Sequence, residues 1–209
     1  MSTSSVLTDT TQLSRLDRAV FRFESFLNLA AGVTIFALVG LAVVHVLSRK
    51  FLNAPVPGYV DWTEQFMAVF AFLGLAYCQR EGGHIRMDIL LSVLKGRRLW
   101  LAEFLSILFM LILTTALIYG TFYHFDRSFD WNAPLFSRDS SIDIALPLWP
   151  AKLIVTFSMA LLWVRLVLQL WGYGRALRTG EATPVAVPLI ETAAETANKE
   201  AHSVEGADE

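Results

Sequence analysis

Four long stretches of apolar residues alternate with short polar segments along the chain. A helix needs about 20 predominantly apolar residues, at 1.5 Å rise each, to cross the bilayer core. The stretches extend over about residues 25–48, 60–79, 101–124 and 148–171. The pattern predicts an all-α membrane protein with four transmembrane helices.

The second stretch is the shortest, and its two ends decide how it fits the membrane. It reaches the length of a span only when the turn that carries Asp61 and Glu64 is included. An acid inside a span costs a few kcal/mol, so both acids should face protein or the membrane interface. Gly82 and Gly83 then break the helix. These signals predict a span over about 60–79.

The segment before the first span, residues 13–26, interleaves basic and apolar side chains. Arg15, Arg18 and Arg22 alternate with Leu, Val and Phe residues. This pattern fits a short amphipathic helix that lies in the membrane interface. It fits the positively charged flank of the first span equally well, and the sequence leaves both interpretations open.

Residues 84–95 can form a second short interfacial helix. Asp88 and Lys95 fall on one narrow polar strip, and apolar side chains cover most of the remaining surface. Arg86 falls on the apolar side, where it needs an acidic partner, a carbonyl or a lipid phosphate. We therefore expect phospholipid at Arg86 and at the basic cluster that follows, Lys95, Arg97 and Arg98.

Composition supports the membrane interpretation. The chain has 209 residues, of which 55% are hydrophobic and 17% charged, and its mean hydropathy is +0.49; soluble domains have about 25% charged residues. The net charge of −2 argues against a nucleic-acid partner. Because the sequence has no zinc-ligand spacing, phosphate-binding glycine loop or Ser/His/Asp context, we predict neither an enzyme nor a bound cofactor or metal.

The chain divides into three parts. Residues 1–24 form an N-terminal segment with the basic lead-in, and residues 25–175 hold the four spans as one domain. In residues 176–209, seven acidic residues against one lysine follow position 180, so we predict a disordered acidic tail and assign it no function.

The basic residues also predict the orientation. Ten Lys and Arg residues flank the spans on the side of the N-terminus, whereas four lie on the opposite side. The positive-inside bias therefore places both termini in the cytoplasm.

Charged residues at the ends of spans suggest two ion pairs. Glu64 begins the second span at the depth of Arg49, which follows the first. Glu103 enters the third span near the depth of Arg165 in the fourth. We predict Arg49 with Glu64 and Glu103 with Arg165. The alternative for Arg165 is that its long side chain snorkels to the lipid headgroups.

Five short motifs follow one another in order between positions 43 and 91. They are Arg-x-Phe at 49–51, Asn-Ala-Pro at 53–55, Glu at 64, Leu-Gly at 73–74 and His-Ile-Arg-x-Asp at 84–88. In this order and spacing the chain resembles the small membrane subunit of tripartite ATP-independent periplasmic (TRAP) transporters, the DctQ type. Met87 stands where that family usually has an aliphatic residue. The resemblance covers most of residues 25–175.

The resemblance implies a subunit of the bacterial inner membrane with four membrane helices and cytoplasmic termini. Such a subunit binds a larger multi-span subunit of the DctM type, which carries the substrate and sodium sites. A periplasmic binding protein of the DctP type delivers an organic acid, and the sodium gradient drives transport. The small subunit resembles a scaffold for the large one.

The residues themselves fit this role, because the predicted spans contain few polar groups and no broken helix of the kind that transporter sites use. We expect its charged residues to act as structural ties or partner contacts. These are Arg49, Glu64, His84, Arg86, Asp88, Glu103 and Arg165. For two of them an alternative stays open: His84 could cap a helix start, and Arg86 could bind a phospholipid.

A second class of protein competes with this interpretation. His45 and His124 fall near the same membrane face on different spans, and two imidazoles can ligate one b-haem in the membrane anchor of an electron-transfer complex. Against it, His124 lies at the very end of its apolar run, and no second pair of histidines occurs within the spans. A third class, an autonomous membrane enzyme, lacks a nucleophile–base pair or a metal cluster.

Overall fold

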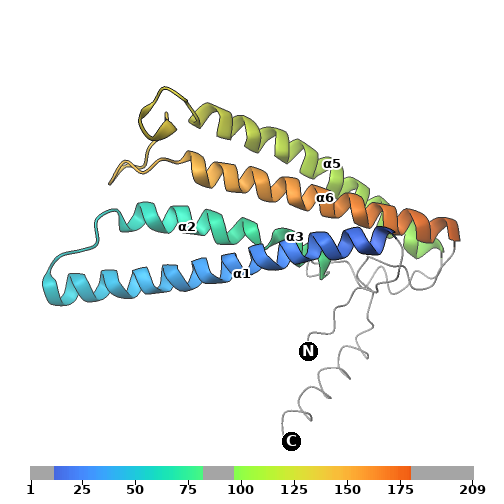
Figure 1. Ribbon diagram of the computed structural model, residues 1–209, viewed down its shortest axis with the longest axis horizontal. Helices are drawn as coiled ribbons and strands as arrows, with labels where there is room; N and C mark the ends of the chain where they lie inside the picture. The colour runs from blue at the N-terminus through green and yellow to red at the C-terminus, as the bar shows by residue number, and fades with distance from the viewer. Residues whose placement is uncertain (1–11, 82–96, 180–209) are drawn as a thin grey trace, which may run out of the picture.

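The computed structural model describes residues 12–81 and 97–179, and the long elements in these ranges are helices (Figure 1). In chain order they are α1 (Gln12–Leu47), η1 (Ser48–Leu52), α2 (Tyr59–Leu73), α3 (Leu75–Arg80), α5 (Arg97–Ser128), η2 (Pro134–Phe136) and α6 (Trp149–Thr179). The predicted all-α class is confirmed. The predicted helix at 84–95, with His84, Arg86, Asp88 and Lys95, and the acidic tail lie outside the described residues.

Three helical segments are long and apolar enough to cross a membrane. They are Leu13–Leu52, Arg98–Ser128 and Trp149–Arg178. They correspond to the first, third and fourth predicted spans. The chain is therefore a membrane protein by the length and composition of its helices.

The second predicted span is divided into two helices. With 15 residues, α2 is about 22 Å long, which is less than the roughly 30 Å of the hydrocarbon core. Gly74 ends it in a turn, and α3 continues to Arg80. The second predicted span is therefore interrupted at Gly74, a break that the sequence did not predict. Glycine favours the break because its helix propensity is low, and the Asn28 side chain fills the space beside it, since an added Cβ would lie 3.4 Å from Asn28 Oδ1.

Residues 13–26 continue without a break into the first span. They belong to α1, a single helix of 36 residues. Arg15, Arg18 and Arg22 are exposed along it, whereas Asp17 and Glu24 are fully buried. Of the two interpretations left open by the sequence, the structure favours a charged flank of the span over a separate interfacial helix.

The helices lie side by side in the order α5, α6, α2, α1, as Figure 1 shows. α6 packs against α5 on one side and against α2 and α3 on the other, and α1 packs along α2. We call the end where α1 begins and α6 finishes the terminal end, and the end with residues 53–58 and 129–148 the loop end. The arrangement leaves the outer sides of α5 and α1 uncovered by other described helices.

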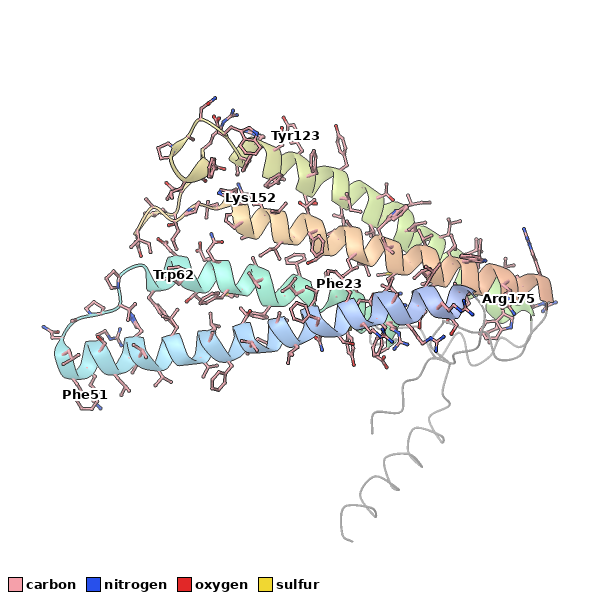
Figure 2. The ribbon with its side chains drawn as sticks, in the orientation of Figure 1. Phe23, Phe51, Trp62, Tyr123, Lys152 and Arg175 are labelled. Carbon is pink, nitrogen blue, oxygen red and sulfur yellow. The ribbon has the colours of Figure 1, made fainter. Side chains whose placement is uncertain are left out.

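The apolar core is small for a chain of this length. One cluster lies between α5 and α6, formed by Trp100, Ile107, Leu162, Leu166, Tyr173 and Ala176. A smaller cluster at the terminal end joins Leu13 of α1 to Leu168 of α6. Many of the other apolar side chains extend outward from the helices, as Figure 2 shows. Only 6% of the apolar window of α1 is buried inside the chain, against 33% for α6. Lipid or a partner protein must therefore cover most of α1.

The loop at 129–148 is fastened to the start of α2. The buried Asp61 carboxylate accepts hydrogen bonds from the Ser141 hydroxyl at 2.6 Å and from the Ile144 N–H at 2.9 Å. Ile144 in turn lies against Gly58, which caps α2 with a φ of +64°. Only glycine adopts this conformation without strain, so Gly58 permits both the turn and the close approach of the loop.

We predict that Gly58→Ala destabilises the protein. Its Cβ would lie 2.4 Å from Ile144 Cδ1, and the left-handed conformation adds about 1–2 kcal/mol for a residue with a side chain. The unfolding midpoint in detergent should fall by several degrees. Gly40→Ala is the control, because no atom lies within 4 Å of its added Cβ; equal midpoints for the two variants would contradict the prediction.

Candidate functional site: a buried charge network

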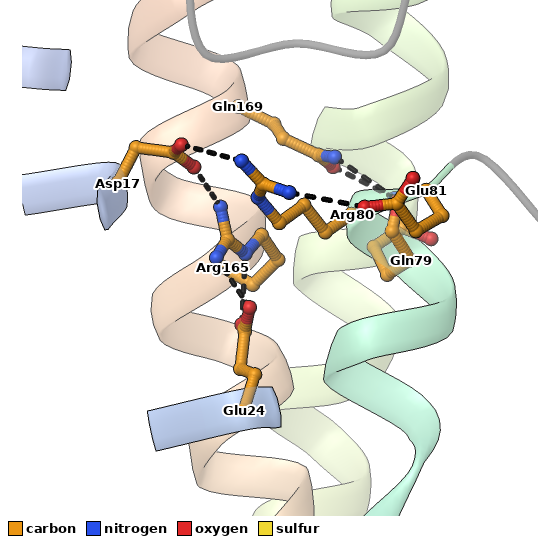
Figure 3. A network of polar contacts seen from close by, with 7 residues as sticks. All are labelled: Asp17, Glu24, Gln79, Arg80, Glu81, Arg165 and Gln169. Atoms are coloured by element: carbon orange, nitrogen blue, oxygen red, sulfur yellow. Dashed lines mark hydrogen bonds and ion pairs between the residues drawn. The ribbon is translucent and has the colours of Figure 1, made fainter. Parts of the chain in front are cut away.

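Arg165 is the centre of a charge network at the terminal end (Figure 3). It lies within α6, and its side chain is 0% exposed. Its Nε donates to Glu24 Oε1 at 2.8 Å, its Nη2 contacts Glu24 Oε2, and its Nη1 contacts Asp17 Oδ1. The guanidinium is therefore bound by two carboxylates, with a bidentate contact to Glu24.

The network continues through Asp17 to Arg80 at the end of α3. Arg80 Nη2 donates to Asp17 Oδ2 at 3.1 Å, and its Nη1 lies 3.0 Å from Glu81 Oε1. The guanidinium carbon of Arg80 lies 3.8 Å from the ring centre of Phe21, within the range of a cation–π contact. Asp17 thus bridges two arginines, one from α3 and one from α6, as Figure 3 shows.

Two glutamine side chains extend the network. Gln79 Nε2 donates to Gln169 Oε1 at 2.7 Å, and Gln169 Nε2 donates to the Gln79 carbonyl at 3.2 Å. Both side chains are buried. The polar groups of α3 therefore bond to α6 directly as well as through the charges.

The electrostatic balance of the network is close to neutral. Asp17, Glu24, Arg80 and Arg165 form two positive and two negative charges with nearly no exposure, and Glu81 at the edge is 29% exposed. Charges removed from water are tolerated when they are paired and hydrogen-bonded, and removal of one partner is strongly unfavourable. The network fixes three helices to one another.

The charge network consists of carboxylates, guanidinium groups and amides. None of its members is a Ser, Cys or His nucleophile or base, and the described residues contain no group of three His, Cys, Asp or Glu side chains that could hold a metal ion. The contacts of the network hold α1, α3 and α6 in one register.

The structure brings together other partners than those predicted. Arg49 and Glu64 are both exposed, and no ion pair or hydrogen bond joins them. Arg165 binds Asp17 and Glu24 in place of Glu103, which is itself buried. Since Arg165 is fully buried, the alternative of snorkelling to the headgroups was also wrong.

The two histidines of the haem alternative lie on helices at opposite sides of the row. His45 on α1 stacks on Tyr59 with 4.1 Å between ring centres, and His124 lies on α5. α2 and α6 stand between those helices (Figure 1). The haem alternative is not supported.

A second polar cluster lies at the loop end. Asp139 accepts hydrogen bonds from the Ser128 hydroxyl at 2.6 Å and from the Lys152 ammonium at 2.9 Å. Arg138 Nε donates to Asp130 at 2.9 Å. The hydrogen bonds from Ser128 and Lys152 hold the pKa of Asp139 below its ordinary value of 3.8. The cluster fastens the loop to both α5 and α6.

Taken together, the fold and the site define a helical membrane protein whose buried charges tie its own helices together. The sequence matches the family described as tripartite ATP-independent periplasmic transporters, DctQ component, over residues 38–175. This range is well over half of the chain, which therefore belongs to the DctQ family of TRAP transporter small subunits. It is a transport subunit and not a member of an enzyme family, and the family associates with DctM and DctP components.

A search of curated proteins finds no match to the chain. Within the family range lie Arg80 and Arg165, whereas their partners Asp17 and Glu24 precede it. The charge network thus joins the family domain to the first part of α1.

We predict that Arg165→Met destabilises the protein by about 3–5 kcal/mol, because Glu24 would be left buried without a cation. Adding Glu24→Gln should recover much of this loss, since Asp17 keeps its contact with Arg80. Arg18→Gln is the control, because Arg18 directly follows Asp17 in the sequence but is exposed. Chemical unfolding in detergent measures the differences. A double variant no more stable than Arg165→Met would contradict the proposed charge balance.

We predict that the contribution of Asp139 to stability depends on pH. Its folded pKa is lowered, so the contribution is present above pH 3.8 and is lost as the pH falls through the folded pKa. Asp139→Asn should lower the unfolding midpoint near pH 6, and its difference from the unaltered protein should shrink as the pH falls below 3.8 and through the folded pKa. Asp126→Asn, an exposed acid on α5, is the control. A difference that stays constant with pH would contradict the assignment.

Proposed function

We propose that this chain is the scaffold for a DctM-type large subunit in a sodium-driven TRAP transporter for an organic acid in the bacterial inner membrane. The observation that carries the proposal is the single row of helices with a small core and long uncovered apolar sides. Phe36 on α1 is 81% exposed and Phe109 on α5 is 71% exposed. Such surfaces are suited to lipid on one side and to a large membrane partner on the other.

The polar groups support a static role. In transporters, substrate and ion sites use broken helices whose free backbone ends point into a cavity. Here the break at Gly74 leads directly into α3, whose Gln79 and Arg80 are bound by α1 and α6. The charges in the described spans serve helix packing, and this leaves substrate and sodium to the large subunit.

We further propose four spans, with α2 and α3 together as the second. Residues 59–80 then cover about 33 Å at 1.5 Å per residue, enough to cross the hydrocarbon core. The excess of basic residues at the terminal end supports cytoplasmic termini. A DctP-type binding protein would then approach the loop end from the periplasm.

The exposed charges are the candidate contacts with the partner. We propose Arg49 and Glu64, which do not pair with each other, for this role. His84, Arg86 and Asp88 follow α3 in sequence and stay candidates for the same interface, with phospholipid as the alternative ligand of Arg86 and of the basic cluster at 95–98. Glu103 and Arg165 are proposed as internal ties.

Co-purification tests the proposal. The tagged chain, expressed in its native host and extracted in mild detergent, should recover a large multi-span protein in about equal amount. Glu64→Lys and Arg86→Glu should reduce that recovery, whereas Arg15→Gln, an exposed change on the flank of α1, should leave it unchanged. Recovery of the chain alone and stable would overturn the scaffold assignment.

The transport activity is tested separately. Vesicles that contain the recovered complex, with its binding protein supplied outside, should accumulate an organic acid when a sodium gradient is imposed. Accumulation that needs ATP, or that is unchanged when potassium replaces sodium, would contradict the sodium-driven mechanism while leaving the scaffold role intact.

A further inference from the structure

A pocket of about 490 Å³ lies at the loop end, between the end of α5 and the start of α6. Its lining comes from both helices and from the loop between them, namely His124, Arg127, Arg138, Asp139 and Lys152. The Asp139 contacts with Ser128 and Lys152 hold these walls together. Neither the charge network nor the proposed scaffold role uses this pocket.

The pocket has a positive charge that its own acid does not neutralise. Arg127, Arg138 and Lys152 line it against one carboxylate, Asp139. Asp139 binds Lys152, and Arg138 is bound from the side by Asp130. Arg127 forms no ion pair with any acid of the described residues, although Asp139 is close enough to interact with it electrostatically, and its guanidinium carbon lies 5.9 Å from the ring centre of Tyr123. Arg127 is therefore available to an anion.

The amino end of α6 adds to this potential. α6 begins at Trp149, and the positive end of its dipole faces the region of Lys152. Arg49 and Lys50 are the other basic residues at the loop end, and both lie on η1. The remaining basic residues at this end, Arg127, Arg138 and Lys152, meet in one pocket.

The depth of the pocket matches the headgroups of a bilayer. His124 ends the third predicted span and Lys152 is in the first turns of the fourth, and Figure 2 shows Tyr123 and Lys152 at this end of their two helices. Toward the membrane centre, α5 exposes large aromatic side chains. Tyr119 is 78% exposed and Phe122 is 56% exposed. A ligand held here would meet cations at one end and an apolar surface at the other.

We propose that this pocket binds the phosphate group of an anionic phospholipid. A guanidinium suits phosphate because its fork can donate two parallel hydrogen bonds, and Lys and His add further donors. The acyl chains would run along the exposed aromatic side of α5. A zwitterionic headgroup suits the pocket less well, since the excess positive charge of the pocket would repel its ammonium group.

The test uses the full chain purified in mild detergent, with phosphatidylglycerol as the probe, and native mass spectrometry counts the bound lipid. The unaltered protein should retain one phosphatidylglycerol. Arg127→Gln with His124→Gln should weaken retention about tenfold or more, the loss expected for one charge-assisted contact. Lys50→Gln, a basic residue at the same end but on η1, should retain the lipid fully. Arg127→Lys should retain part of it.

Each result decides the proposal. Both changed side chains are exposed, and equal unfolding midpoints without lipid would show that the variants are folded. Equal retention by the double variant would overturn the site, and equal retention of phosphatidylcholine would overturn the preference for an anion. Stabilisation by inorganic phosphate to the same degree as by phosphatidylglycerol would assign the pocket to a free anion and overturn the lipid.

Discussion

The burial of one guanidinium constrains the terminal half of this structure. Arg165 has no access to water, so its charge must be matched by acids from a neighbouring helix. Glu24 and Asp17, both on α1, match it. Two carboxylates on one helix fix both its rotation and its height relative to α6. The apolar contact between α1 and α6 is small, with Leu13 and Val20 against Leu168, so the charge network supplies most of what fixes this register.

The break in the second membrane segment is connected to the same constraint. A straight helix from α2 would continue along its own axis, whereas the turn at Gly74 starts a new helix. α3 places Gln79 and Arg80 against α6 and α1, where each finds a partner. This rigidity suits the proposed function, because a scaffold that deformed together with the large subunit could not hold that subunit in place. At the loop end, Asp61 and Asp139 have the corresponding role of fastening a connection to the helix starts.

The apolar runs were sufficient to predict the third and fourth spans, because the length of an uncharged helix is a direct signal. Hydropathy gives depth but not rotation about the helix axis, so it placed Glu103 near the depth of Arg165 but could not show which acid faces the arginine. Leu13, Asp17, Val20 and Glu24 recur at helical spacing and point to one face of α1, opposite the exposed arginines. That periodicity was available in the sequence. The loop-end pocket was not, because it depends on the path of twenty irregular residues between α5 and α6.

The charge network also constrains how the protein is made. Asp17 and Arg165 are separated by 148 positions, and the arginine belongs to α6, the last of the described helices to leave the ribosome. Until α6 is made, Asp17 and Glu24 lack the buried guanidinium of Arg165. The arginines of α1 itself are Arg15, Arg18 and Arg22. Closure of the network is thus a late event in biogenesis. A chain truncated before α6 would keep its first helix and the pair of Asp17 with Arg80, but Glu24 would have no cation to match its charge.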